Sequence, residues 1–462
     1  MLNRILIANR GEIVARIIRE CKDNSIGTVA VYSEADKNSL HVILADRGVC
    51  VGAAPSPQSY LNVGNIIESA RNTGCDAIHP GFGFLSENAD FARLCAEEGI
   101  EFIGPSPEVI EKLGDKAEAK KTMKAAGVPV VPGSEGPVGS AKEAKEIASS
   151  VGLPVLIKAS AGGGGRGMRV AETLDAIEPA YNEASMEAEK CFGDGRVYVE
   201  KLIRNPRHVE FQILADKFGN VIHLGERNCS VQRRNQKMLE EAPDFALSEE
   251  MRISMGKDAV KAAKAAGYEN AGTVEFIVDG GNYYFIEMNT RLQVEHPVTE
   301  MITGINIVKQ QLRIASGLPL EIAQEDVEFS CHAIECRINA EDIFNNFAPS
   351  PGHVSFLHFP LGNQVRVESA LYSGCDISPF YDSMVAKIIV CGSTRLEAIR
   401  RMRRALEETI IQGIKTTLPI QLLIMYNREF LRGNYDTGFV EKNMAELLKL
   451  YEEAGGRDES VQ

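Results

Sequence analysis

The first 113 residues alternate between short apolar segments and segments with helical periodicity. The apolar segments RILIAN, TVAVYS and CDAIHPGFGF predict buried strands, and Ile13, Val14, Ile17, Ile18 and Cys21 have the spacing of one helix face. This strand–helix alternation favours a doubly wound parallel sheet. The turn ANRGEI after the first strand is poor in glycine, so it does not match the nicotinamide dinucleotide fingerprint.

Proline and glycine mark the boundaries of further units. The segment VIEKLGDKAEAKKTMKAAG predicts a helix, and VPVVPGSEGP after it predicts a crossing between units. We expect a Rossmann-like N-terminal domain at residues 1–113, a domain at 114–330 that includes a smaller unit at 130–203, and a C-terminal domain at 331–447. Residues 448–462 are polar and predict a disordered tail.

Charge and cysteine usage narrow the class of protein. The net charge of −14 argues against nucleic acid as a partner but not against a small anionic substrate. The ten cysteines form no C-x-x-C pair, which favours reduced thiols. The N-terminus meets charge too early for a signal peptide, and no apolar run approaches the roughly 20 residues that span a bilayer. We therefore expect a cytoplasmic protein without a membrane partner.

A glycine run in LIKASAGGGGRGMRV suggests a phosphate-binding loop. It does not fit the Walker A pattern, and although Gly162, Gly164 and Gly167 match G-x-G-x-x-G, no helix is predicted directly after them. LPVLIK and GMRVA flank the run and predict two short strands. The run is therefore expected at the tip of a hairpin that can close over a nucleotide; a flexible surface hairpin is the alternative.

The segment GTVEFIVDGGNYYFIEMN predicts a hairpin whose strands carry facing acids. VDGGNYY is a turn signal, and folding the chain about Gly281 brings Glu275 opposite Glu287. Facing like charges destabilise a strand pair unless a cation neutralises them, and oxygen ligands suit magnesium. Asn289 lies two residues beyond Glu287 on the same face. These residues therefore predict a magnesium site.

Polar residues continue at every second position beyond this pair. Arg291, Gln293 and Glu295 follow Glu287 and Asn289 in an extended row. A plain half-buried strand would also alternate, but a solvated edge more often carries lysine, threonine and serine. The mixture of acids, amides and arginine therefore favours a functional site.

Two further segments carry candidate polar residues. RHVEFQIL predicts a strand with His208, Glu210 and Gln212 on one face, which an ordinary amphipathic strand would also show. ERNCSVQRRNQKMLEEAP concentrates positive charge and is a candidate anion site, unless it is a solvated loop paired with its own acids; the charged residues are Arg227, Arg233, Arg234, Lys237, Glu240 and Glu241. RRMRRAL is expected on a solvated helix face, and HAIECRINAED predicts a strand with Arg337, which a surface arginine would also explain.

Together these segments resemble the ATP-grasp enzymes and, among them, the biotin carboxylase family. The resemblance covers nearly the whole chain and rests on ILIANRGEIVARIIR, HPGFGFLSEN, KASAGGGGRGM, RHVEFQ, ERNCSVQRRNQK, EMNTRLQVEHPVTE and FYDSMVAKII. It implies a mixed α/β and α+β architecture: an ATP-grasp fold with a Rossmann-like N-terminal domain, a mobile glycine-loop lid and a C-terminal domain. It also implies that the glycine run is the tip of that lid.

The resemblance carries site residues over by position. The residues that it implies for ATP are Lys116, Lys158, Gly164 and Gly165 at the phosphates, Glu200, Lys201 and Ile203 at the adenine, and His208, Gln232 and Asn235 near the ribose and phosphates. The implied Mg²⁺ or Mn²⁺ ligands are Glu275, Glu287 and Asn289, and the implied bicarbonate site is Arg291, Gln293 and the backbone of Val294, with Lys237 nearby. Glu295 matches the general base and Arg337 the residue that steadies ionised biotin.

The implied reaction is ATP- and bicarbonate-dependent carboxylation of biotin through carboxyphosphate. No Met-Lys-Met attachment motif occurs, so biotin is expected on a separate carrier protein, with a carboxyltransferase subunit to complete the reaction. Acetyl-CoA carboxylase is the expected assembly, and a pyruvate or propionyl-CoA carboxylase is the alternative. A carbamoyl-phosphate-forming ligase and a non-catalytic nucleotide-binding scaffold are more distant alternatives. Family resemblance also implies a homodimer. Asn235 departs from the histidine that several relatives carry, which puts only nucleotide contacts in doubt.

Overall fold

The N-terminal part of the chain forms a parallel sheet. The computed structural model describes residues 2–160 and 167–453. The sheet has the strand order β3-β2-β1-β4-β5, and its strands pair in parallel, as predicted. Its strands are β1 (Arg4–Ile7), β2 (Gly27–Ser33), β3 (Arg47–Gly52), β4 (Ala77–His79) and β5 (Glu101–Phe102). Its helices are α1 (Gly11–Asp23), α2 (Leu40–Leu44), α3 (Val63–Thr73), α4 (Ala89–Glu97) and α5 (Pro107–Gly114).

The segment predicted as one helix after residue 108 forms parts of two. Helix α5 ends at Gly114, and α6 (Lys116–Ala125) begins at once because the Asp115 side chain accepts hydrogen bonds from the backbone N–H groups of Ala117 and Glu118. A side-chain acceptor at this position satisfies amides that a new helix would otherwise leave unpaired.

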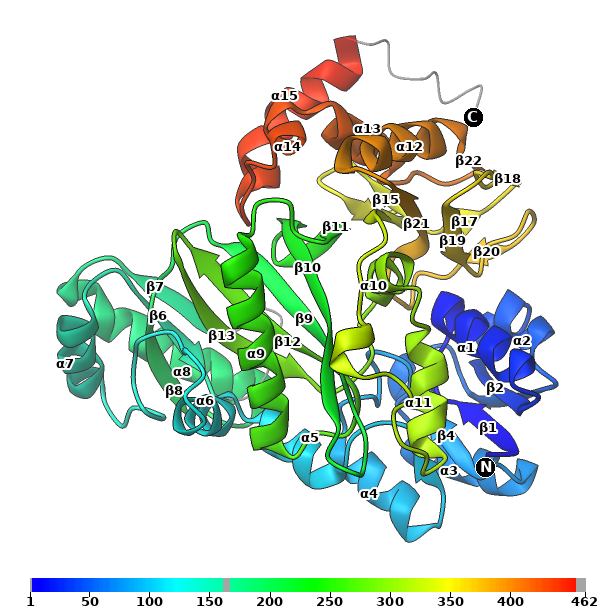
Figure 1. The fold of residues 1–462 in the computed structure, drawn as a ribbon, viewed down its shortest axis with the longest axis horizontal. Coiled ribbons are helices and arrows are strands. Elements are labelled where there is room, and N and C mark those ends of the chain that lie inside the picture. Colours follow the sequence, from blue (N-terminus) through cyan, green and yellow to red (C-terminus); the bar gives the residue numbers. More distant parts are fainter. Residues whose placement is uncertain (1, 161–166, 454–462) are drawn as a thin grey trace.

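A small unit projects to the left in Figure 1 and contains the predicted hairpin. Its sheet has the order β7-β6-β8, formed by β6 (Val155–Ala159), β7 (Met168–Ala171) and β8 (Val197–Lys201), with helices α7 (Ala141–Val151) and α8 (Ile177–Phe192). Strands β6 and β7 pair antiparallel, with Lys158 opposite Met168, so the hairpin is confirmed. Gly164 and Gly165, predicted at its tip, lie outside the described residues.

A long antiparallel sheet runs through the rest of the chain, in the order β13-β12-β9-β10-β11-β14-β21-β19. Its strands are β9 (Arg207–Ala215), β10 (Val221–Arg233), β11 (Gln236–Ala242), β12 (Asn270–Asp279), β13 (Asn282–Asn289), β14 (His332–Asn339), β19 (Val365–Ser369) and β21 (Met384–Gly392). Pairing of β11 with β14 carries the sheet across residue 330, where the sequence analysis expects a domain boundary. Helix α9 (Glu249–Ala266) packs on β9 and β10.

Further helices and short strands complete the structure, most of them at the top and upper right of Figure 1. They are α10 (His296–Thr303), α11 (Ile307–Ala315), α12 (Arg395–Glu408), α13 (Leu418–Tyr426), α14 (Arg428–Arg432), α15 (Phe439–Glu453), β15 (Glu341–Asp342), β16 (Ala348–Pro349), β17 (Gly352–His353), β18 (Phe356–His358), β20 (Asp376–Ile377) and β22 (Ile410–Gln412). Helix α12 buries its predicted apolar face. The arginines of RRMRRAL lie on its other faces, where they point to solvent or contact neighbouring groups. Among the helices that the structure describes, none has the length and apolar character needed to span a bilayer.

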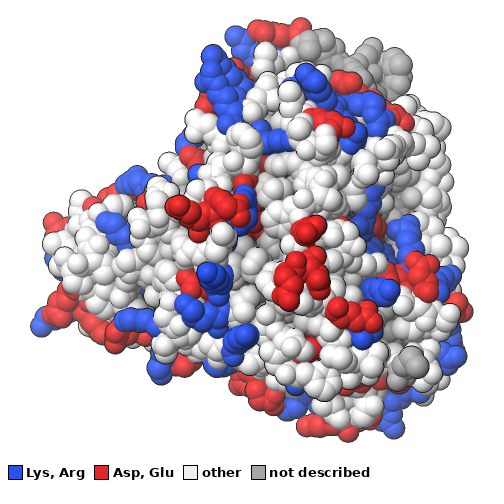
Figure 2. Space-filling view, in the orientation of Figure 1, with Lys and Arg blue, Asp and Glu red and all other residues white. Residues whose placement is uncertain are grey.

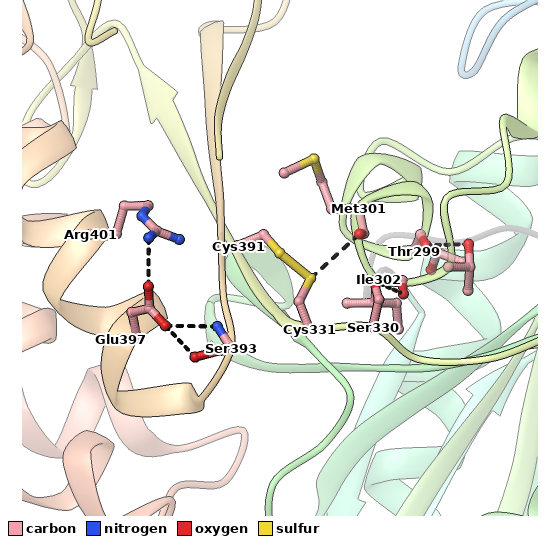
Figure 3. Close-up of a disulfide and its surroundings, with 10 residues drawn as sticks. Thr299, Met301, Ile302, Ser330, Cys331, Cys391, Ser393, Glu397 and Arg401 are labelled. Atoms are coloured by element: carbon pink, nitrogen blue, oxygen red, sulfur yellow. Dashed lines mark hydrogen bonds and ion pairs between the residues drawn. A yellow bond between two sulfur atoms is a disulfide. The ribbon is translucent and has the colours of Figure 1, made fainter. Parts of the chain in front are cut away.

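Two expectations are wrong in part: the disordered tail for residues 448–453, with 454–462 outside the described residues, and reduced thiols for one pair of cysteines. Helix α15 continues to Glu453, into the stretch predicted as a disordered tail, because Met444, Leu447 and Leu448 pack on the core at helical spacing. Within the described residues Cys331 and Cys391 form a disulfide, whereas the other cysteines are free thiols. Figure 3 shows that this disulfide lies beside α10, where the Cys331 sulfur contacts the Met301 carbonyl.

The parts of the chain meet at Glu300 on α10. Its buried carboxylate accepts hydrogen bonds from Arg16 on α1 (3.0 Å), Arg366 on β19 (2.7 Å) and the backbone N–H of Ile307 (2.7 Å). Burial alone would raise the pKa of Glu300, but the positive charges of Arg16 and Arg366 contribute to lowering it to about 2. On the face of the molecule in Figure 2, acidic and basic side chains are interspersed.

Glu300→Gln should therefore destabilise the protein in a pH-dependent way. A carboxylate with a pKa near 2 in the folded state and an ordinary value of 4.5 stabilises the fold above about pH 5, and this contribution is lost as the pH falls toward 2. We expect the difference in unfolding free energy between wild type and variant, measured with urea, to be largest near pH 7 and to shrink between pH 5 and pH 3. A difference that does not change with pH would contradict this assignment.

Candidate active site

One large cavity of about 990 Å³ gathers nearly all the predicted site residues. It lies where the N-terminal unit, the small unit of β6–β8 and the long sheet converge. Every predicted site residue that the structure describes lines it: Lys116, Lys158, Glu200, Lys201, Ile203, His208, Gln232, Asn235, Lys237, Glu275, Glu287, Asn289, Arg291, Gln293, Val294, Glu295 and Arg337.

The ammonium group of Lys237 organises one wall of the cavity. Lys237, near the start of β11, lies 2.5 Å from Glu210, 3.0 Å from Glu275 and 2.7 Å from Glu295. The three carboxylates come from β9, from β12 and from the residue before α10. Register explains part of the arrangement, because β9 and β12 pair with Glu210 directly opposite Glu275. Lys237 thus reduces the repulsion among three acids, two of which also pair with an arginine, Glu210 with Arg227 and Glu295 with Arg337.

These contacts fix the protonation states of the group. Burial alone would lower the pKa of Lys237, but the carboxylates around it hold that pKa well above its ordinary value. Burial alone would raise the pKa of Glu295, but Lys237 and Arg337 contribute to holding it well below. Lys237 and His208 likewise contribute to holding the pKa of Glu275 well below its ordinary value, against the effect of burial. Glu275 and Glu295 are therefore ionised and the lysine is charged at neutral pH.

Arg337 contacts Glu295 from the opposite side to Lys237. Its Nη2 atom lies 2.8 Å from Glu295 Oε2, and its Nε donates to Glu240 at 2.7 Å. Arg337 lies on β14, as predicted, and Glu240 lies on the neighbouring strand β11. Glu240 and Glu295 thus share the guanidinium group, and Arg337 remains part of the cavity lining.

The predicted acidic hairpin is confirmed. Strands β12 and β13 pair antiparallel, with Glu275 directly opposite Glu287. Asn289 donates its amide to Glu275 at 2.9 Å, and Lys116 lies 3.2 Å from Glu287. This set of carboxylate and amide oxygens beside the cavity fits a hard divalent cation such as Mg²⁺. His208 also reaches Glu275, at 2.8 Å.

The prediction that the polar row beyond Asn289 continues as an extended strand is wrong. β13 ends at Asn289, and residues 290–295 leave the sheet as a loop that leads into α10. Pro297 in the first turn of α10 favours this start, because proline fits the first positions of a helix but breaks a strand ladder. The loop nevertheless keeps Arg291, Gln293 and Glu295 at the cavity.

Side-chain hydrogen bonds hold this loop in place. Arg291 donates to Gln293 Oε1 at 3.0 Å and to Asn289 Oδ1 at 3.1 Å, and its Nε lies 3.1 Å from Glu87. Gln293 in turn donates to Glu275 at 2.9 Å. The guanidinium group of Arg291 is thus fixed in orientation at the cavity wall, in a geometry suited to a planar anion.

Lysines on the small unit and on α6 contact an acid at the far end of the cavity. Lys158 on β6 lies 2.7 Å from Glu200, and Lys120 on α6 lies 3.0 Å from the same carboxylate. Lys201 lines the cavity, but its ammonium donates to the carbonyls of Gly152 and Leu153. Lys120 was missed by the sequence analysis, because its place on an ordinary-looking charged helix gives no signal.

The candidate anion site of four basic residues does not form as a unit. Arg227 is fully buried beneath the cavity against Glu210, whereas Arg233 and Arg234 contact Asn346. Only Lys237 of the four lines the main cavity among the described residues. The alternative, a solvated loop, is also wrong, because the segment forms the hairpin of β10 and β11.

The N-terminal unit contributes residues that the sequence analysis missed. Asn9, Arg10, Phe82 and Gly83 line the cavity from the loops after β1 and β4. These strands lie side by side at the centre of the parallel sheet, and ligands of such sheets bind beyond the carboxyl ends of the strands. Strand order could have indicated these loops, but sequence alone does not specify that order.

Comparisons with known proteins agree along the whole chain. Residues 1–110 match the family model "Biotin carboxylase, N-terminal domain", residues 115–323 match "Carbamoyl-phosphate synthase L chain, ATP binding domain", and residues 335–442 match "Biotin carboxylase C-terminal domain". Fold and cavity together define a mixed α/β enzyme of the ATP-grasp class.

Individual relatives identify the family of this chain within the ATP-grasp class. Biotin carboxylase 1 of Bacillus subtilis is 56% identical over 96% of this chain and 98% of its own length. A pyruvate carboxylase subunit of Methanothermobacter thermautotrophicus is 51% identical over 98% of this chain and 93% of its own. The biotin carboxylase domain dimer of the Hydrogenobacter thermophilus 2-oxoglutarate carboxylase, solved with MgADP, ADP and bicarbonate, superposes with a TM-score of 0.93 at 52% identity, covering 97% of this chain and 99% of that one. This chain belongs to the biotin carboxylase family.

Lys237→Met should destabilise the protein more at high pH than at low pH. The variant leaves Glu210, Glu275 and Glu295 facing one another without their shared cation, and breaking a buried charge pair typically costs about 3–5 kcal/mol. Protonation of these acids at low pH relieves the repulsion. We expect urea unfolding to show a larger loss at pH 8 than at pH 5.5; an equal loss at both would contradict the charge arrangement.

Proposed function

We propose that this protein is an ATP-dependent ligase that carboxylates biotin with bicarbonate, through carboxyphosphate. The observation that carries the proposal is the convergence of Arg291, Lys237, Glu295 and Arg337 on one cavity that also holds the facing acids of β12 and β13. A nucleotide-binding scaffold has no physical use for a buried cation–carboxylate network of this kind. The biotin carboxylase models on both flanks favour this reaction over carbamoyl-phosphate formation.

The end of the cavity near the small unit suits ATP. Glu200, Lys201 and Ile203 are proposed to border the adenine, and His208, Gln232 and Asn235 are proposed to border the ribose and phosphates; all six line the cavity. Lys116 and Lys158 supply positive charge for the phosphates. Gly164 and Gly165 are proposed to donate backbone N–H groups when the small unit closes over the nucleotide, which would exclude water from phosphoryl transfer.

Glu275, Glu287 and Asn289 are the proposed ligands of Mg²⁺ or Mn²⁺. When bound there, the ion would neutralise negative charge that develops on the phosphates during transfer. Lys116 beside Glu287 and Lys237 beside Glu275 hold these carboxylates in place by their positive charge.

Bicarbonate is proposed to bind at the loop that follows β13. The guanidinium group of Arg291 can grip its two oxygens as a fork, while Gln293 and the backbone of Val294 supply hydrogen bonds. Glu295 is the proposed base: Lys237 and Arg337 keep it ionised, so it can accept the bicarbonate proton. The bicarbonate oxygen then attacks the γ-phosphorus of ATP and releases ADP.

Carboxyphosphate decomposes to CO₂ and phosphate inside the closed cavity. The phosphate takes the proton from the ureido nitrogen of biotin, which leaves negative charge on the ureido oxygen. Arg337 is proposed to stabilise that oxygen electrostatically. The biotin nitrogen then attacks CO₂ to form carboxybiotin.

The partners follow from this chemistry. Biotin is proposed to arrive on a biotin carboxyl carrier protein, and a carboxyltransferase subunit is proposed to pass the carboxyl group to acetyl-CoA in fatty acid synthesis. A pyruvate or propionyl-CoA acceptor is the alternative, and the 51% identity to a pyruvate carboxylase subunit supports the pyruvate acceptor. We further propose a homodimer in the cytoplasm, the dimer supported by the dimeric domain of the Hydrogenobacter relative.

Phosphate release by the purified protein tests the proposal. With ATP and Mg²⁺ we expect release to require bicarbonate and to rise when free biotin is added. Glu295→Gln should lower kcat by about two to four orders of magnitude, because the base contributes about that factor. Glu226→Gln is the matched control: this glutamate is equally buried but contacts Arg252 outside the cavity, and its kcat should stay near wild type. Bicarbonate-independent release by the wild type, or a Glu295→Gln variant as active as the control, would contradict the proposal.

A further inference from the structure

Lys387, on β21, has a side chain that is completely buried. Its ammonium group donates a hydrogen bond to the backbone carbonyl of Val294 at 2.7 Å and lies 2.9 Å from Glu12. Glu12 lies in the first turn of α1. Three distant parts of the chain, the N-terminal unit, the loop after β13 and the long sheet, therefore meet at one lysine.

Side-chain contacts, rather than strand pairing, hold the loop that Lys387 contacts. Residues 290–295 have left the sheet, so strand pairing does not fix their backbone. Arg291 and Gln293 are held by side-chain hydrogen bonds, and Leu292 is buried in the core of the N-terminal unit. At Val294 the backbone itself is held, and the donor is Lys387. A functional loop needs such supports because small displacements of its groups cost catalysis.

The charge of Lys387 is balanced where it lies. A buried ammonium group is costly unless carboxylates surround it. Burial alone would lower the pKa of Lys387, but Glu12, Glu335 and Glu368 raise it above its ordinary value. The lysine is therefore charged, which strengthens the hydrogen bond that it donates to the Val294 carbonyl.

Lys387 also lies on the strand pair that carries Arg337, the residue proposed to stabilise ionised biotin. Strands β14 and β21 pair antiparallel, with Arg337 directly opposite Lys387. Paired residues of neighbouring strands point to the same face of a sheet. The loop is thus attached to the same strand pair that carries Arg337, so the distance between the anion-binding loop and Arg337 is set by the sheet.

We infer that Lys387 is a positioning residue for the bicarbonate-binding loop, acting through the Val294 carbonyl. The inference rests on the proposed function, because it assigns the support of the site that binds bicarbonate. Lys387 itself does not line the cavity, and its direct contact with the site is the Val294 carbonyl; its partner Glu12 does line the cavity, which is why Glu12→Gln is measured alone. Loss of the donor should weaken bicarbonate binding selectively and leave ATP binding nearly unchanged.

Three variants separate this role from a merely structural one. Lys387→Met removes the donor but leaves Glu12 without its partner, so it tests the donor and charge balance together. Lys387→Met combined with Glu12→Gln removes the donor and also the charge of the nearest carboxylate, 2.9 Å away, so Glu12 is not left as an unpaired charge. Glu12→Gln alone keeps the donor to Val294. Arg395→Met, which removes a similarly buried arginine contacting Glu241 far from the loop, controls for general loss of stability.

The readout is the KM for bicarbonate and the KM for ATP in Mg²⁺-dependent phosphate release, with thermal unfolding measured in parallel. We expect the double variant to raise the KM for bicarbonate at least tenfold and the KM for ATP less than threefold, while Glu12→Gln and Arg395→Met keep the wild-type KM for bicarbonate. A wild-type KM for bicarbonate in the folded double variant would overturn the inference. Equal rises for both substrates, or in the Arg395→Met control, would overturn it as well. Wild-type phosphate release that ignores bicarbonate would instead overturn the proposed function.

Discussion

The attraction between Lys237 and its surrounding carboxylates is the interaction on which the site depends. Glu210, Glu275 and Glu295 come from three different elements, and Lys237 is the cation that all three contact. Because the cation is shared, the three acids can lie close together in a buried place. One of them can then serve as a metal ligand and another as a base, although they lie only a few ångströms apart. Arg337, which we propose steadies ionised biotin, adds a second cation to Glu295.

Buried charge also joins the parts of the molecule around the cavity. Glu300 connects α10 to α1 and β19, and Lys387 connects β21 to α1 and to the loop before α10. Apolar packing would hold these parts together without fixing their orientation, whereas hydrogen-bonded charges have directional partners. The loop of residues 290–295 is thus held in place both by the N-terminal unit and by the long sheet. The small unit of β6–β8 contributes Lys158 and Glu200 to the cavity, in keeping with a lid.

Contacts between residues that are close in the sequence could be predicted, whereas contacts between distant residues could not. The pairing of Glu275 with Glu287 follows from a turn that the residues between them encode, so counting from the turn was sufficient. The row from Arg291 to Glu295 was wrongly extended as a strand, because its polar alternation also suits a loop whose side chains converge on a cavity. Lys387 lies in FYDSMVAKII, one of the segments that carry the resemblance, but this segment alone does not predict its contacts, because they are made to Glu12 and to a loop almost a hundred residues earlier. Family resemblance placed Arg337 correctly at the cavity, where its pattern alone left a surface arginine open.

The central claim is that bicarbonate held at Arg291 and Glu295 attacks the γ-phosphorus of ATP. Bicarbonate labelled with ¹⁸O tests it directly, because the attacking oxygen stays on phosphorus when carboxyphosphate loses CO₂. The labelled substrate would be supplied with ATP, Mg²⁺ and biotin, and the mass of the released phosphate would be measured. We predict one bicarbonate oxygen in each phosphate formed. Phosphate without the label would show that water, not bicarbonate, attacks ATP, and would contradict the mechanism.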